Sequence, residues 1–214
     1  MRTVFKAFCA AVAIGCIAAP AANAATPFGG KLTVNLGVAG VLPDESAKIS
    51  PIGGTVDITN TYVPATTLDY ALSDKLSVEL LCCVTPHKVK AVSTSVGTVN
   101  LGKVTLFPPT LTLKYHFLRD APVKPYVGAG VNVTAFFNEK LPSGPVRSID
   151  YETTVGPALQ LGANIPISDR LVFNLDVKKI WIEPNVKLDT VLGPVKADVK
   201  INPIVTFIGV GYKF

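Results

Sequence analysis

The sequence predicts an all-β protein, an eight-stranded antiparallel up-and-down transmembrane β-barrel with short periplasmic turns and long extracellular loops. Three observations predict it. Apolar and other residues alternate with a period of two in segment after segment, which is typical of strands whose two faces meet different surroundings. The links between these segments are alternately short and long, as in outer-membrane barrels. The chain also ends on an aromatic residue, Phe214, within one such alternating segment.

The composition favours a protein with little water-facing surface. Hydrophobic residues make up 49% of the chain and charged residues only 16%, whereas soluble domains have roughly 25% charged residues. The formal net charge is +5 and its basic residues are scattered, which argues against a nucleic-acid partner. After the first segment, no apolar run approaches the ~18–20 residues of a spanning helix.

The first segment, residues 1–24, has the features of a secretory signal peptide. Arg2 and Lys6 precede an apolar run over 7–19, and Ala22-Asn23-Ala24 is an A-x-A cleavage signal. An uncleaved membrane anchor is the alternative, but the run is too short to span a bilayer. We therefore expect cleavage after Ala24 and a single barrel domain over 25–214.

Eight segments pass the alternation test for half-buried strands. The second is the weakest, because Pro64 and Asp69 interrupt its pattern. Strands of about ten residues match a tilted crossing of a bilayer. The segments are 31–41, 64–72, 75–83, 110–117, 125–137, 154–165, 171–179 and the C-terminal stretch ending at 214.

The links at 73–75, 118–124 and 166–170 are short. The links at 42–63, 84–105, 138–150 and 183–199 are long and rich in Pro, Gly, Ser, Lys and Asp, so we expect solvated loops there. In the last of them, lysines and aspartates are interspersed, as in a loop exposed to water: Lys187, Lys196, Lys200, Asp189 and Asp198.

The last strand must pair with the first to close the ring, because an open edge leaves unpaired backbone groups in hydrocarbon. Ile208 and Val210 would then face lipid, with Tyr212 and Phe214 in the aromatic girdle. Gly209, Tyr212 and Phe214 also resemble the C-terminal signal read by the bacterial barrel-assembly machinery. The alternative is an ordinary core strand at the end of a sandwich.

The faces opposite the apolar residues would line the lumen of the barrel. Eight strands enclose a space just wide enough for side chains or one small ligand. We expect Glu79 to bond with a lysine or with His116 as a structural plug, although a role in conduction remains open. Inward glycines either accommodate large opposing side chains or leave a channel. The predicted lining residues are Glu79, Thr112, Lys114, His116, Asn132, Thr134, Gln160, Asn174, Asp176 and Lys178.

The sequence gives no support to a catalytic, metal or cofactor site. It has no G-x-S-x-G, P-loop or H-E-x-x-H motif, and His87 and His116 are far apart. The adjacent Cys82 and Cys83 would point to opposite faces of a strand. A strained vicinal disulfide between them is the alternative in an oxidising compartment.

Several segments resemble the OmpW family of small outer-membrane proteins, which includes AlkL-type proteins linked to hydrocarbon uptake. The resemblance runs over most of 32–214 and is most specific in Pro-Pro-Thr-Leu (108–111) and Pro-Tyr-Val-Gly-Ala-Gly (125–130). The loops match poorly, and Val155 stands where the family commonly has Trp.

The resemblance implies a Gram-negative outer-membrane barrel that passes small hydrophobic or amphipathic molecules, with release sideways through the wall. Pro108 and Pro109 would interrupt strand pairing and loosen that wall, or merely bend the start of a strand. The partners would be outer-membrane lipid, lipopolysaccharide and the transported solutes. A closed-lumen barrel that contacts host, phage or bacteriocin, and a soluble periplasmic lipid carrier, are the alternative functions.

Overall fold

The computed structural model describes residues 28–118, 121–141, 146–191 and 193–214. The predicted signal peptide and its cleavage at Ala24 lie outside these residues. In the described part of the chain, no helix is long and apolar enough to cross a membrane.

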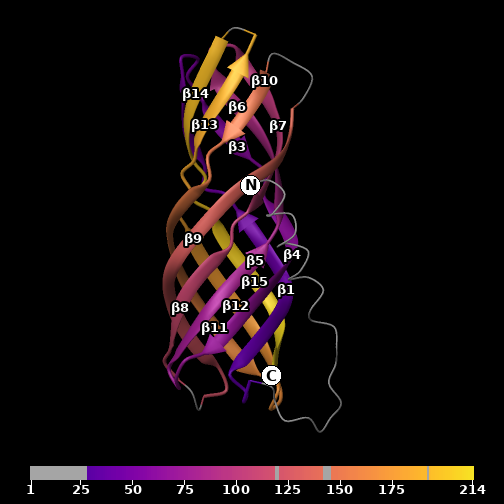
Figure 1. Cartoon of the computed structure of the whole chain (residues 1–214), viewed down its shortest axis with the longest axis vertical. Helices are drawn as coiled ribbons and strands as arrows, with labels where there is room; N and C mark the ends of the chain where they lie inside the picture. The colour runs from indigo at the N-terminus through magenta and orange to yellow at the C-terminus, as the bar shows by residue number, and fades with distance from the viewer. Residues whose placement is uncertain (1–27, 119–120, 142–145, 192) are drawn as a thin grey trace.

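Eight antiparallel strands close into a barrel, as predicted (Figure 1). β15 pairs with β1 from Thr33 opposite Lys213 to Leu42 opposite Ile204, and β9 pairs with β11 on the other side. The strands are, in their order around the barrel, β1 (Leu32–Leu42), β4 (Thr61–Ala71), β5 (Leu76–Cys83), β8 (Thr110–His116), β9 (Lys124–Lys140), β11 (Thr154–Pro166), β12 (Leu171–Ile180) and β15 (Ile204–Lys213).

The barrel is apolar outside and polar inside, which confirms the predicted alternation. Leu36 and Leu161 are 56% and 61% exposed on the outer wall, whereas Glu79 and Lys114 are fully buried. Only an apolar solvent makes this arrangement favourable, because hydrocarbon stabilises exposed aliphatic side chains and water does not. The outer wall of the barrel is therefore a lipid-facing surface.

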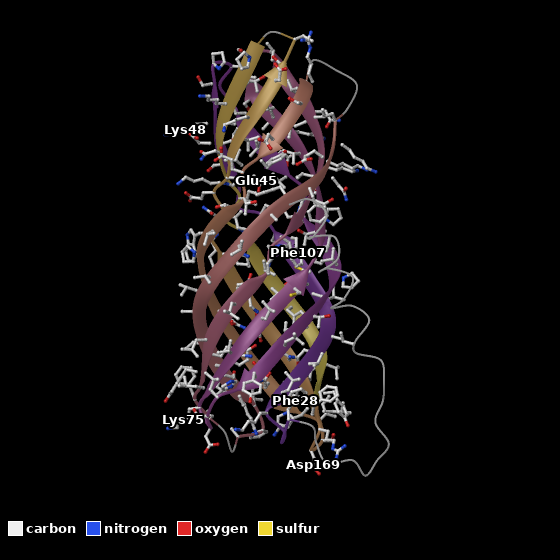
Figure 2. The ribbon with its side chains drawn as sticks, viewed as in Figure 1. Phe28, Glu45, Lys48, Lys75, Phe107 and Asp169 are labelled. Atoms are coloured by element: carbon white, nitrogen blue, oxygen red, sulfur yellow. The ribbon has the colours of Figure 1, made fainter. Side chains whose placement is uncertain are left out.

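The short links at 73–75 and 166–170 turn at one end of the barrel, near Lys75 and Asp169 (Figure 2), and β8 and β9 pair there up to His116 opposite Tyr126. The four long links were wrongly predicted to be loops, because strands occupy much of them and carry the fold beyond the barrel (Figure 1). We call these strands the extension: β2 (Ser46–Ser50), β3 (Thr55–Ile58), β6 (Thr85–Thr94), β7 (Gly97–Phe107), β10 (Val146–Tyr151), β13 (Asn185–Thr190) and β14 (Gly193–Lys200).

The extension consists of two groups of strands. In one, β3, β6 and β7 continue the barrel sheet, because β7 pairs with the end of β9 from Lys103 opposite Lys140 to Phe107 opposite Ala135. In the other, β10, β13, β14 and β2 form a separate four-stranded sheet.

The polarity of the wall reverses between barrel and extension. In β13 and β14, Leu188 and Val199 are buried, while Lys187 and Lys196 point outward and are exposed. Apolar-in and charged-out alternation is the pattern of a sheet in water. The lysines and aspartates that predicted a solvated loop therefore belong to the solvated face of two strands. The reversal marks the level at which the lipid-facing wall ends.

Candidate functional site: a closed lumen below an apolar cavity

The barrel lumen is filled by polar side chains from six strands. We call them the lumen cluster, and each lies on the inner face of its strand. All but Asp69 are at most 5% exposed. The members are Asp69, Glu79, Thr112, Lys114, Tyr126, Gln160, Asn174, Asp176 and Lys178.

Glu79 is the centre of the lumen cluster. Its Oε2 accepts a hydrogen bond from Lys114 Nζ at 2.8 Å, and its Oε1 is 2.8 Å from Lys178 Nζ. Gln160 Nε2 also donates to Glu79 Oε1, at 2.9 Å. A buried charge needs such partners. Glu79 therefore bonds with two lysines, where the sequence predicted one. Lys114 lies on the neighbouring β8, and Lys178 lies across the barrel on β12.

The rest of the lumen cluster extends from this centre. Gln160 Nε2 donates to Asp176 Oδ2 at 2.7 Å, and Lys178 Nζ donates to Asp176 Oδ1 at 2.5 Å. The Thr112 hydroxyl donates to Gln160 Oε1 at 2.5 Å. Asn174 joins through Tyr126, whose hydroxyl oxygen accepts from Asn174 Nδ2 at 2.9 Å.

The lumen cluster has two members that were not among the predicted lining residues. The Asp69 carboxylate accepts from Lys114 Nζ at 2.5 Å, and the Tyr126 hydroxyl donates to Asp176 Oδ2 at 2.8 Å. Lys114 Nζ also lies 4.0 Å from the centre of the Tyr126 ring. The period-two alternation could have placed both side chains in the lumen. Asp69 lies on the strand face opposite Leu68 and Tyr70, and Tyr126 lies on the same face as the inward Gly128.

Glycine makes room for the lumen cluster. A Cβ atom on Gly162 would lie 2.4 Å from the Tyr126 hydroxyl oxygen and 2.6 Å from the Leu175 carbonyl oxygen. The inward glycines were predicted either to accommodate large opposing side chains or to leave a channel. Gly162 supports the first alternative.

His116, Asn132 and Thr134 lie at the edges of the lumen rather than in the cluster. His116 is half-buried, with its Nε2 3.0 Å from the Ser77 hydroxyl oxygen. It borders a polar vestibule of about 390 Å³ at the end with the short turns. Asn132 is buried and donates to the carbonyl oxygens of Pro108 and Pro109, and Thr134 donates to Asn132 Oδ1 at 2.6 Å.

Pro108 and Pro109 lie within a long hairpin whose ladder is interrupted. Below them β5 pairs with β8 up to Leu81 opposite Thr110, and above them β6 pairs with β7 from Thr85 opposite Leu106. The register is the same on both sides. We call the interval the seam: residues 82–84 facing residues 107–109. Figure 2 places Phe107, at one end of the seam, where the barrel meets the extension.

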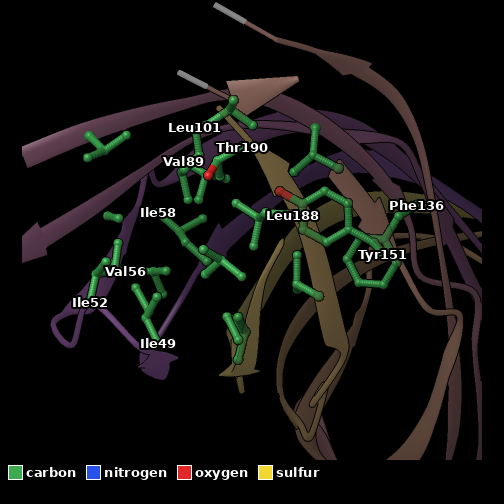
Figure 3. Close-up of a pocket in the computed structure, with 18 of the residues that line it drawn as sticks. Ile49, Ile52, Val56, Ile58, Val89, Leu101, Phe136, Tyr151, Leu188 and Thr190 are labelled. Atoms are coloured by element: carbon green, nitrogen blue, oxygen red, sulfur yellow. The ribbon is translucent and has the colours of Figure 1, made fainter. Parts of the chain in front are cut away.

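The interior of the extension holds an apolar cavity of about 160 Å³. Ile49, Val56, Leu101 and Leu188 reach it from different strands, and the Phe136 and Tyr151 rings stack at one side with their centres 5.1 Å apart (Figure 3). Burial raises the pKa of Tyr151 above its usual range. The cavity can accommodate the body of a small apolar molecule.

A smaller void of about 10 Å³ lies between the cavity and the seam. His87, Leu106 and Ile201 line both spaces, and Cys83 and Pro108 of the seam line the void. In the sequence, His87 was noted only for its distance from His116. Cys83 and Cys82 are separate thiols on opposite faces of β5.

Two of the predicted insertion residues, Gly209 and Tyr212, lie on β15, where it closes the barrel, and Phe214 follows directly after that strand. The Tyr212 and Phe214 rings form an edge-to-face pair with their centres 4.8 Å apart, and Phe214 N donates to the Leu32 carbonyl oxygen at 2.8 Å. Gly209 lies against the Phe207 ring and the backbone of β1. Their recognition by the barrel-assembly machinery stays a prediction.

Comparison with known proteins agrees with this architecture. A model of the OmpW family matches residues 29–214. The chain is 37% identical over 177 residues to the uncharacterised outer-membrane protein y4mB of Sinorhizobium fredii, covering 82% of this chain and 76% of that protein. It is 30% identical to the dibenzothiophene metabolism operon protein PahQ of Pseudomonas aeruginosa, covering 98% of this chain and 99% of that protein.

Solved structures show the same fold. The outer membrane protein OprG of Pseudomonas aeruginosa superposes with a TM-score of 0.80 at 28% identity, covering 86% of this chain and 96% of that one. The structure of AlkL in lipid bilayers gives a TM-score of 0.69 at 22% identity, covering 92% and 95%. With its lipid-facing wall, closed ring and family match, the chain belongs to the OmpW family and is an outer-membrane protein.

Proposed function

We propose that this barrel lets small hydrophobic or amphipathic molecules cross the outer leaflet passively, entering through the extension and leaving sideways into the membrane at the seam. The observation that carries the proposal is the stacking of three features. An apolar cavity lies in the extension, a smaller void lies between it and the seam, and a polar cluster fills the lumen below.

The physical need for such a path comes from the outer leaflet. The sugars and charged groups of lipopolysaccharide dissolve apolar molecules poorly, although the acyl chains beneath dissolve them well. An apolar cavity above the lipid-facing wall offers these molecules a site out of water. A solute that reaches the seam then needs only to pass between two strand segments to enter hydrocarbon.

The lumen cluster favours sideways release over passage through the barrel. A solute moving straight down would have to displace Lys114 and Lys178 from the Glu79 carboxylate, and unpaired charges in a lumen are costly. Pro108 and Pro109 supply no backbone N–H groups for a ladder, so the wall beside the void carries fewer bonds to break. We therefore assign the lumen cluster to a plug and the two prolines to the exit.

The named relatives support the class of solute. PahQ is named after a dibenzothiophene metabolism operon, and dibenzothiophene is an apolar aromatic compound. That name says nothing about what PahQ binds, so it supports a hydrophobic solute without identifying one.

A closed barrel that serves as a structural or surface-interaction protein is the second candidate. The filled lumen favours it, because the cluster needs no transport role to be stable.

An uptake assay separates the two functions. The protein is reconstituted into vesicles with lipopolysaccharide in the outer leaflet, and entry of radiolabelled toluene is followed.

We expect faster toluene entry than into protein-free vesicles, and slower entry for a Pro108→Val, Pro109→Val double variant that can complete the ladder. Circular dichroism establishes that the double variant is folded. Equal entry with and without the protein favours the closed barrel. If the protein and the double variant speed up toluene entry equally, transport is supported, but the exit does not lie at the seam.

A further inference from the structure

His87 is a buried polar residue in apolar surroundings. It is 3% exposed and lines both the cavity and the smaller void. Its Nδ1 lies 2.7 Å from the Thr59 carbonyl oxygen, and its Nε2 has no hydrogen-bond partner among the described residues. A buried polar atom without a partner costs free energy, so this one calls for an explanation.

The partners of Nδ1 fix the tautomer of the His87 ring. A carbonyl oxygen only accepts, so Nδ1 must carry the proton that it donates to Thr59. Thr61 Oγ1, 3.4 Å away, already donates its own proton to the Pro86 carbonyl oxygen. Because a neutral imidazole has one donor and one acceptor, Nε2 is an acceptor that needs an O–H or N–H group.

Thr85 provides a second unsatisfied group in the same place. It is fully buried, and its Oγ1 has no partner among the described residues. Thr85 and His87 are two residues apart on β6, so their side chains share its inner face. Both line the void of about 10 Å³, which is the size that one oxygen atom needs.

We propose that His87 Nε2 and Thr85 Oγ1 bind the hydroxyl group of a small phenol or alcohol whose single ring occupies the apolar cavity. The hydroxyl would donate to Nε2 and accept from Thr85. This inference rests on the proposed function and specifies its solute.

The cavity and the two polar atoms define the chemical class together. A cavity of about 160 Å³ suits a body the size of benzene. Ethers and ketones offer only acceptors to the acceptor Nε2 and are disfavoured. Ammonium and carboxylate ions would have to leave water for an apolar site, which is costly. A neutral hydroxyl compound meets every requirement.

Three probes of similar size test the proposal: phenol, anisole and toluene. The protein is embedded in lipid nanodiscs, and binding is measured by calorimetry against empty nanodiscs, which corrects for partition into lipid. We expect phenol to bind several-fold, up to about tenfold, more tightly than toluene, the effect of one or two net hydrogen bonds. Anisole, which cannot donate, should bind like toluene. The ¹⁵N resonance of His87 Nε2 should shift with phenol alone.

Two variants locate the effect. Thr85→Val is nearly isosteric and should lower the phenol preference, and His87→Leu should abolish it, while both still bind toluene. Thr66→Val is the matched control, because Thr66 is half-buried and lies on the lipid-facing side of β4. This variant should retain the preference for phenol over toluene. The thermal unfolding of each variant establishes that it is folded.

Equal affinity for all three probes would overturn the proposal and leave a trapped water as the partner of Nε2. A phenol preference that survives both Thr85→Val and His87→Leu would overturn it as well. In either case toluene binding keeps the apolar cavity and the proposed function intact. If none of the probes binds, the cavity is not a solute site, and the proposed function fails with the inference.

Discussion

Glu79 and Lys178 stand on opposite sides of the barrel and meet in its lumen, with Lys178 Nζ 2.8 Å from Glu79 Oε1. Glu79 lies on β5 and Lys178 on β12, and three strands separate them in either direction around the wall. Both side chains are 1% exposed. This ion pair therefore ties the barrel across its diameter, independently of the backbone ladders.

Replacing Lys178 should destabilise the barrel strongly. Lys178→Met leaves Glu79 with Lys114 as its only cationic partner among the described residues and removes the lysine partner of Asp176. Breaking a buried ion pair from one side costs about 3–5 kcal/mol, because the remaining charge stays buried. Urea titration of the protein in lipid vesicles measures the free energy of unfolding.

Lys187→Met is the matched control for this substitution. Lys187 Nζ is also 2.8 Å from a carboxylate, that of Glu152, but these side chains are 60% and 45% exposed. Water screens such a pair, so the free energy of unfolding should change little. Equal losses in the two variants would show that the lumen cluster contributes no more than a surface pair.

Gly162→Ala should destabilise the barrel by about 1–3 kcal/mol, the usual range for overpacking a filled interior. The new methyl group would press on the Tyr126 hydroxyl and on the Leu175 carbonyl oxygen. Tyr126→Leu removes the first conflict and leaves the second. A double-mutant cycle should therefore show that alanine costs less in the Tyr126→Leu background. Additive costs would mean that Tyr126 does not fill the space beside Gly162.

The eight-stranded barrel was predictable because lipid outside and polar groups inside impose strict alternation on every strand. Leu36 and Val38 alternate with Asn35, and such alternation together with alternately short and long links is typical of an outer-membrane barrel. The lumen residues were predictable from the same alternation, because they lie on the strand face opposite the apolar residues. Their partners were not, because residues as distant in sequence as Glu79 and Gln160 meet only once the register and the closure are set.

The extension was not predicted, although its alternation is present in the sequence. Thr85, His87, Val89 and Ala91 alternate with Pro86, Lys88 and Lys90. Charged residues and prolines there were interpreted as loop signals, because the apolar faces were expected to point toward lipid. The strands of the extension carry charged residues on their outer face, whereas the barrel strands carry apolar ones there. Their sequences therefore resemble those of solvated loops. The cavity was not predicted for the same reason, because most of its lining comes from links that were predicted to be solvated loops.

Locking the seam should block the proposed exit. Continuing the ladder register places residue 109 opposite Cys82, so Pro109→Cys in a Cys83→Ala background puts two thiols across the seam. We expect oxidation to slow toluene entry into lipopolysaccharide-bearing vesicles and reduction to restore it, with mass spectrometry verifying the disulfide. The control pair, Leu80→Cys with Leu111→Cys in a background without the native thiols, lies in an intact ladder and should have no effect. Unchanged entry through a locked seam would exclude release there.

Mild acid should weaken the extension through His87. Burial is the main cause that lowers the pKa of His87 below its ordinary 6.5, while the Thr59 carbonyl and the charge of Glu45 act in the opposite direction. With a lower pKa in the folded state, the unfolded chain binds more protons just below pH 6.5, so the stabilising effect is complete above that pH and is lost as the pH falls toward the folded pKa. The free energy of unfolding should therefore decrease between pH 7.5 and 5.5. His87→Gln should flatten this part of the profile, while His116 is the same in both proteins. An identical slope in the variant would assign the pH dependence to another group.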